Sequence, residues 1–327
     1  MPLAARAAIQ RVVPSRRCHR AMSSATVAPE RAPYTPVPFA GLVARTPVPF
    51  PLYLRTADDT WVLYRPAGTP LDESHLGRLQ AEGIAGLFVR DGDRTAYCER
   101  VEHALDSLLR ERTAPVEARA SVLAGVAALV ADELLQGPPT RAAVQRAQKV
   151  LFATSGFLLR ENQGFTAVRR VLGATPGLAQ HSLRTGLLTM GLAKLVLSAD
   201  GNLLATAGLA GLLHDIGRVG YETIEHDPEH TLRGAALLQG LGLPAPVVEA
   251  ARAHHERWDG SGYPFGTAGL QIPELARVVG MVNAFDKVYT GGGVRRSVYE
   301  ALRVLAQAYR GCFDERCAAG LVRMFRT

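Results

Sequence analysis

Residues 254–264 read His-His-Glu-Arg-Trp-Asp-Gly-Ser-Gly-Tyr-Pro, which places two adjacent histidines directly before a glycine-rich loop. The pattern of apolar residues over Pro244–His255 predicts that both histidines lie in the last turn of a helix. The run Asp259-Gly260-Ser261-Gly262 ends that helix and holds the following chain on a fixed path. Adjacent histidines before a rigid loop predict a metal site whose outer hydrogen-bonding groups come from the loop.

A second stretch, Leu212-Leu213-His214-Asp215-Ile216-Gly217-Arg218, ends an apolar helix that begins near Leu203. Because the apolar face of such a helix packs into a bundle, the helix delivers His214 and Asp215 to one end of that bundle. Adjacent helical residues point about 100° apart. His214 can therefore bind one metal while the two oxygens of Asp215 reach a second. A buried ion pair or a capping aspartate would explain the same pair without a metal.

Histidines are concentrated in the second half of the chain. Six of the nine lie between residues 181 and 255, namely His181, His214, His226, His230, His254 and His255. A single histidine is most often structural, but several on different predicted helices favour a shared site. Neutral imidazole and carboxylate groups are the ligands of first-row metals such as iron, manganese, zinc and nickel. The cluster therefore predicts a metal centre.

The His214-Asp215 pair, the His254-His255-Glu256 run and Gly262-Tyr263-Pro264 together resemble the HD-GYP group of HD-domain phosphohydrolases. The resemblance covers about residues 175–325, and residues 34–97 are similar to a small module often found before such domains. The fold class implied is mainly α, an HD-type helical bundle preceded by a small N-terminal α/β module.

The resemblance implies hydrolysis of the bacterial second messenger cyclic di-GMP, to linear dinucleotide or to GMP, by two divalent metals, iron or manganese. Carried onto this chain, it implies metal ligands at His181, His214, Asp215, His230, His254, His255 and Asn283. Asp215 is the implied bridge between the metals. His230 is preferred over His226 because it keeps the family's spacing to Gly234, so His226 is expected in a solvated loop.

Arg218 stands where the family usually has lysine, and the resemblance implies a two-pronged contact from its guanidinium to the scissile phosphate. Asp215 and Arg218 are the implied catalytic residues, and Arg218, Arg295 and Arg296 are the implied substrate-binding residues. The alternative for Arg218 is an arginine that caps the end of its own helix. A hydroxide between two metals would be the nucleophile, and the metals would offset charge on the phosphoryl oxygens.

Three features depart from the family pattern. The family's last metal-binding aspartate falls on Asn283, whose neutral amide holds a hard cation more weakly, and Asp286 could replace it only if the helix rotated. Gly177 replaces a glutamate that completes a third metal site in some members, and the stretch from Asp215 to His230 is shorter than usual. These departures support an alternative, a degenerate HD-GYP domain that acts as a cyclic-dinucleotide receptor or a protein-interaction module. A third alternative is a hydrolase of another phosphate ester.

The composition and the apolar pattern of the sequence predict four segments. Residues 1–33 are expected to be a disordered tail or a mis-annotated start, with Met22 as the alternative first residue. A small α/β regulatory module is predicted at 34–100, a helical linker at 101–139, and the HD-GYP-like all-helical domain at 140–327.

Local patterns predict elements inside these segments. Strands are predicted at 50–54 and 61–64, and a helix at 69–82 that Gly83 ends. A second hairpin is predicted to pair 87–89 with 95–97. A helical pattern covers 101–135, and Thr140 is the predicted N-cap of the next helix.

The excess positive charge is concentrated near the N-terminus. The 327 residues carry a formal charge of +7, and residues 1–29 hold five arginines and no acid, so the rest of the chain is nearly neutral. This distribution argues against a DNA or RNA partner. The apolar stretches are too short to cross a bilayer, so we expect a cytoplasmic bacterial signalling enzyme without membrane insertion. Cyclic di-GMP is the expected partner, and a homodimer through the helices at 101–135, or a signalling protein, is compatible with the pattern.

Overall fold

The chain divides into two units, Met1–Pro33 and Tyr34–Thr327. The computed structural model describes residues 34–38, 42, 47–56, 60–71, 73–84, 86–110, 115–172, 177–221, 227–291 and 296–326. The predicted tail at 1–33 therefore lies outside the described residues, and everything below concerns the second unit.

A small antiparallel sheet begins the second unit. Its strands are β1 (Tyr34–Pro38), β2 (Leu52–Arg55), β3 (Trp61–Arg65) and β4 (Gly86–Arg90), in the spatial order β1-β4-β2-β3. The predicted first hairpin is confirmed, because β2 and β3 pair with Tyr53 opposite Leu63. Helix α2 (Glu73–Ala81) lies between β3 and β4, and Gly83 follows it with a positive φ of 78°, as expected of a residue that ends a helix.

The predicted second hairpin is wrong. After β4, Asp91–Asp93 form a single 3₁₀ turn, η3, which leads directly into helix α3 (Arg94–Arg110), so residues 95–97 are helical. Tyr97 and Cys98 are buried in the core, and the Arg94 guanidinium donates to Leu129 O at 2.8 Å. Packing against α4 therefore decides the conformation here, and an alternation over three residues is too short to distinguish a strand from a helix.

Helices make up the rest of the unit, which confirms the mainly α fold class. They are α4 (Val116–Leu135), α5 (Arg141–Arg160), α6 (Gly164–Val171), α7 (Leu178–Val196), α8 (Gly201–Leu213), α9 (His230–Gly240), α10 (Ala245–Ala253), α11 (Glu274–Thr290), α12 (Val298–Ala308) and α13 (Glu315–Met324), with 3₁₀ turns η4 (Ile216–Arg218) and η5 (Gly269–Gln271). The Thr140 side chain caps α5 as predicted, accepting from Ala143 N at 3.1 Å. The helical pattern over 101–135 divides into α3 and α4, and α4 starts after Pro115.

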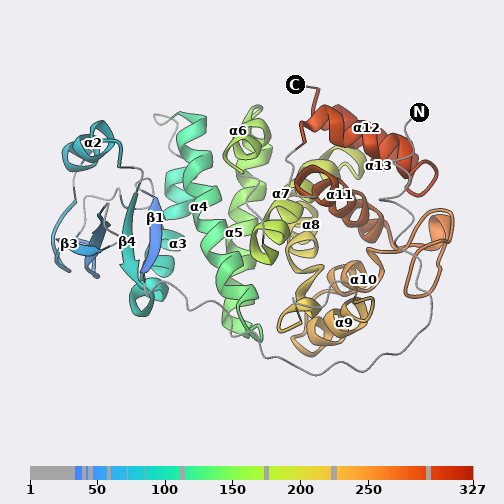
Figure 1. Ribbon diagram of the computed structural model, residues 1–327, viewed down its shortest axis with the longest axis horizontal. Coiled ribbons are helices and arrows are strands. Elements are labelled where there is room, and N and C mark those ends of the chain that lie inside the picture. Colours follow the sequence, from blue (N-terminus) through green and yellow to red (C-terminus); the bar gives the residue numbers. More distant parts are fainter. Residues whose placement is uncertain are drawn as a thin grey trace. The chain divides into compact units, whose positions relative to one another are not determined.

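One apolar core continues from the sheet through α3, α4 and α5 to α7–α10, and a second lies among α7, α11, α12 and α13. Figure 1 shows α4 and α5 between the sheet and α7. The predicted boundaries near residues 100 and 139 stay predictions. Among the described residues, no helix combines the length and the apolar character needed to cross a bilayer. The histidines of interest lie at the starts of α7 and α9 and at the ends of α8 and α10.

Candidate metal centre

Close packing of α7 against α8 places the first two histidines side by side. A Cβ atom at Gly211 would lie only 2.8 Å from Thr185 O, so the two helices touch through their backbones. The chain reverses direction between them, which brings the start of α7 to the end of α8. As a result, the Nε2 atoms of His181 and His214 are 3.2 Å apart.

The other helices reach the centre through equally close backbone contacts. A Cβ at Gly217 would lie 2.1 Å from His230 O, and one at Gly280 would lie 2.6 Å from His254 O. Glycine is therefore required where η4 meets α9 and where α11 meets α10. These contacts bring His230 and His254 together, with their Nε2 atoms 3.4 Å apart.

The Asp215 carboxylate lies between the two histidine pairs and is buried. Its Oδ1 is 3.0 Å from His230 Nε2 and 3.4 Å from His254 Nε2. Its Oδ2 is 3.6 Å from His214 Nε2 and 3.8 Å from His181 Nε2. Two ligand sets therefore share this carboxylate: a four-residue set of Asp215, His230, His254 and His255, and a three-residue set of His181, His214 and Asp215.

Hydrogen bonds fix which ring nitrogen of each histidine faces the centre. Nδ1 of His214 donates to Gly211 O at 2.8 Å, Nδ1 of His254 donates to Ala251 O at 2.9 Å, and Nδ1 of His230 donates to Asp227 O. A carbonyl oxygen only accepts, so in each neutral ring Nδ1 carries the proton and Nε2 presents a lone pair. Lone pairs and a carboxylate this close repel one another unless cations lie between them. The residues present therefore fit bound metal ions.

The protonation states also suit metal binding. Burial is the main cause that lowers the pKa of His214, His254 and His255 below the usual histidine range, so these rings are neutral. Burial would raise the pKa of Asp215, but the neighbouring His214 and Lys287 and the contacts with His230 and His254 lower it well below its usual value. Neutral imidazole and ionised carboxylate are the forms that coordinate a metal.

Three buried polar atoms at the centre have no hydrogen-bond partner among the described residues. They are Asp215 Oδ1, His255 Nε2 and Asn283 Oδ1. Asn283 is one helical turn from Gly280, which packs on His254, and one turn from Asp286, which contacts His181. Asn283 therefore lies on the face of α11 that meets the centre. Buried polar groups are almost always satisfied in native proteins, so these atoms also fit a metal.

Asp286 does not take the place of a metal ligand at Asn283. Its Oδ2 accepts from His181 Nδ1 at 2.7 Å, and its Oδ1 accepts from Arg184 Nε at 2.7 Å. No rotation of α11 is needed for this contact. The carboxylate instead orients the His181 ring so that Nε2 faces Asp215, which is a common arrangement around metal-binding histidines.

The predicted loop after the histidine pair is held by Glu256. Its two carboxylate oxygens accept from Phe265 N at 2.8 Å and from Thr267 N at 2.9 Å. A Cβ at Gly262 would lie 2.5 Å from His255 O, so the loop passes directly over the end of α10. Tyr263, which is followed by a cis peptide bond to Pro264, stacks on His255 with ring centroids 4.5 Å apart. The loop therefore fixes His255 from outside, as its sequence predicts.

The predicted arginines have different surroundings. Arg218 is half-buried in η4, its backbone N–H donates to Asp215 O at 2.9 Å, and its charge acts on Tyr263 and Lys287. Arg296 donates to Val288 O at 2.9 Å and to Gly291 O at 3.2 Å, so its guanidinium covers the end of α11. Arg295 and His226 lie outside the described residues. The substrate contacts of Arg218, Arg295 and Arg296 stay predictions.

Lys287 is a charged residue near the centre that the sequence patterns do not indicate. It follows Asp286 on α11, and its side chain is accessible to solvent. Burial has the largest effect on the pKa values of Asp215, His214 and His254. The positive charge of Lys287 lowers each of these three pKa values. Its position one turn after Asn283 is the only signal in the sequence that points to this role.

Comparison with known proteins agrees with this geometry. Residues 174–316 match the model of the HD domain family. The matched segment includes His214, Asp215 and the other predicted ligands, in agreement with the resemblance to HD-domain proteins.

Curated relatives cover part of the chain. A cyclic di-GMP phosphodiesterase of Pseudomonas aeruginosa is 32% identical over 185 residues, which are 52% of this chain and 44% of that protein. A cyclic di-GMP phosphodiesterase of Thermotoga maritima is 34% identical over 31% of this chain and 30% of its own. A 3'3'-cGAMP-specific phosphodiesterase of Vibrio cholerae is 27% identical over 48% of this chain and 37% of its own. The chain thus spans less than half the length of these relatives.

A solved structure shares the fold over most of the chain. It is described as a HDG"Y"P protein from Bdellovibrio bacteriovorus and superposes with a TM-score of 0.65. The match covers 90% of this chain and 100% of that chain at 19% identity. At this identity the match shows a shared fold.

Proposed function

We propose that this chain is a metal-dependent phosphodiesterase that hydrolyses cyclic di-GMP to the linear dinucleotide, to GMP, or to both. The observation that carries the proposal is the pair of ligand sets that share Asp215. Relatives named cyclic di-GMP phosphodiesterases match the chain at 32–34% identity, which supports the choice of substrate.

Each residue of the centre has its own proposed role. One metal would be held by His230, His254 and His255. The other would be held by His181, His214 and Asn283, and Asp215 would contact both. Nitrogen and carboxylate ligands without thiolate suit iron or manganese. Two such ions supply an activated hydroxide and offset charge on the phosphoryl oxygens. Arg218 and Lys287 add positive charge near the centre, which favours a phosphodiester substrate.

The direct test is turnover by the metal-loaded chain. We expect protein purified anaerobically with iron or manganese to convert cyclic di-GMP to linear dinucleotide or GMP, measured by chromatography. Parallel assays with 3'3'-cGAMP and with simple phosphate esters separate the other substrates, because one relative is specific for cGAMP. Metal-containing protein that leaves cyclic di-GMP intact would contradict the proposal.

A second candidate function is a cyclic-dinucleotide receptor with little hydrolysis. The observation that favours it is charge: Asp215 is the only carboxylate in the two ligand sets among the described residues, Asn283 is neutral, and Lys287 is cationic. Two divalent ions are therefore poorly compensated at this centre. The His181–His214 set, with fewer ligands, should lose its metal first.

Replacing Asn283 with aspartate tests this second candidate. We expect Asn283→Asp to tighten metal binding at the three-residue set by roughly tenfold and to raise turnover, because a carboxylate replaces a neutral ligand. Metal content by mass spectrometry and turnover are both measured. Asn202→Asp is the matched control, since Asn202 is exposed at the opposite end of α8 from His214. If Asn283→Asp changes neither quantity, the neutral amide is not what weakens this set, and the observation that favours the receptor function is lost.

A further inference from the structure

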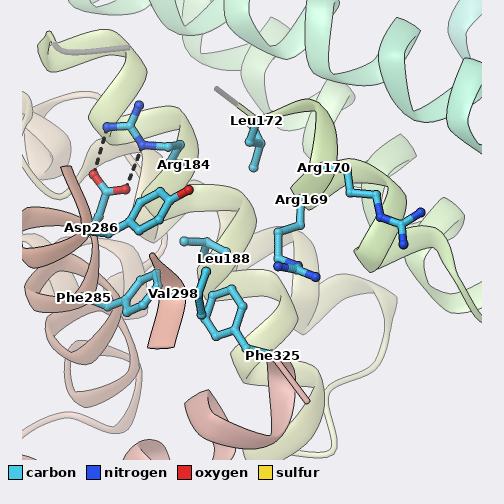
Figure 2. A pocket seen from close by; sticks show the side chains of 10 residues that line it. Arg169, Arg170, Leu172, Arg184, Leu188, Phe285, Asp286, Val298 and Phe325 are labelled. Atoms are coloured by element: carbon cyan, nitrogen blue, oxygen red, sulfur yellow. Dashed lines mark hydrogen bonds and ion pairs between the residues drawn. The ribbon is translucent and has the colours of Figure 1, made fainter. Parts of the chain in front are cut away.

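A cavity of about 180 Å³ lies beside Asp286 and Arg184 (Figure 2). Asp286 lines this cavity and contacts His181 Nδ1, whereas Nε2 of the same ring faces Asp215. The walls come from α6, α7, α11, α12 and the segment after α13. The cavity is therefore distinct from the two ligand sets.

Two cations that line the cavity, Arg169 and Arg170, have no acidic partner among the described residues. Asp286 is the only acid among the lining residues, and it is already bound by Arg184, at 2.7 Å from Nε and 3.0 Å from Nη2, and by His181. Arg169 has no ion pair among the described residues, and its Nε is buried without a hydrogen-bond partner there. Burial, with the nearby charge of Arg170, lowers the pKa of Arg169. Arg169 is half-buried, and a half-buried guanidinium in these surroundings would be stabilised by an anion.

The Arg169 side chain is positioned by an aromatic ring. Its guanidinium carbon is 5.2 Å from the ring centroid of Phe325, and the two side chains lie together in Figure 2. Arg170 points away from the other labelled side chains in the same view. The remaining wall near Arg169 is apolar and includes Leu188, Phe285 and Val298. A charged group thus adjoins a surface that suits an apolar or aromatic body.

We propose that this cavity binds a small organic anion, with a carboxylate or phosphate group on Arg169 and a flat apolar body against Phe325 and Leu188. The guanidinium fork matches either acidic group. At roughly 15 Å³ for each water molecule, the cavity has room for about a dozen non-hydrogen atoms. That size fits a substituted aromatic acid rather than a whole cyclic dinucleotide, so the site goes beyond the proposed phosphodiesterase function and does not rest on it.

The test is calorimetric titration of the full metal-loaded chain with phenylphosphonate, benzoate and inorganic phosphate. We expect the aromatic anions to bind at least about tenfold more tightly than inorganic phosphate, because only they fill the apolar wall. Comparison of phenylphosphonate with benzoate decides between a phosphate and a carboxylate ligand. Equal binding of all three anions would contradict the proposal.

Variants locate the binding site. Arg169→Gln should weaken binding of the aromatic anions about tenfold, and Arg169→Lys should restore part of it, because a charge-assisted contact is lost and then partly replaced. Arg141→Gln, an exposed arginine at the start of α5, is the matched control and should bind normally. Val298→Phe keeps every charge but fills the cavity, and it should also weaken binding. Binding that survives both Arg169→Gln and Val298→Phe, or that disappears when a chelator removes the metals, overturns the proposal.

Discussion

Replacing Asp215 with alanine will remove metal from both ligand sets and lower turnover of cyclic di-GMP by about a thousandfold or more. The reason is geometric, since one carboxylate lies within 3.0–3.8 Å of four histidine Nε2 atoms and belongs to both sets. Without it, each set keeps only neutral ligands, which do not offset the charge of a divalent ion. Metal content per chain and turnover are the two measurements.

Single histidine variants give the contrast that makes this prediction specific. His214→Ala should empty only the three-residue set, and His230→Ala only the four-residue set, so each should keep about half of the bound metal. Glu229→Ala is a suitable control, because that side chain is 81% exposed although it is next to His230. If Asp215→Ala keeps the wild-type metal content while remaining folded, Asp215 is not a shared ligand.

The residues of the centre are largely predictable because each lies at a helix end or beside a chain break. His214 follows the last residue of α8, His230 begins α9, and His254 follows α10. Local sequence marks such positions clearly, through an apolar helix that stops at polar residues or a glycine-rich loop. The structure brings all six predicted histidine and aspartate ligands together, and their role as ligands stays a prediction.

The outer contacts are not predictable in the same way. Asp286 and His181 are 105 residues apart, and their contact exists only because α11 packs on α7. The sequence places Asp286 one turn from Asn283 but does not say which partner it meets. The same limit explains the failure at residues 95–97, where packing on α4 selects a helix. Long-range packing decides these features, and a single sequence records it weakly.

Glycines show how packing and function are joined in this domain. Gly217 and Gly280 allow backbone contacts with His230 and His254 that any Cβ atom would prevent. The histidine positions therefore depend on residues that have no functional group. A sequence pattern that considers only chemistry-bearing side chains omits this part of the site.

Replacing Asp286 with asparagine will weaken metal binding at the three-residue set by about 10-fold to 100-fold, because His181 loses the carboxylate that orients its ring. The free energy of unfolding should also fall by roughly 3 kcal/mol, since the buried Arg184 loses its anionic partner. Metal titration and denaturant unfolding measure the two effects. Metal at the four-residue set should be retained, because Asp286 does not contact that set among the described residues.

A double variant separates the positioning of His181 from the stability of the ion pair. Asp286→Asn with Arg184→Gln removes both charges, so it should recover much of the lost stability while metal binding at His181 stays weak. Recovery of both the free energy of unfolding and the metal affinity would mean that Asp286 acts only through Arg184 and does not orient His181. Because His181 Nδ1 is 2.7 Å from Asp286 Oδ2 and its Nε2 faces Asp215, we expect stability to recover without metal affinity.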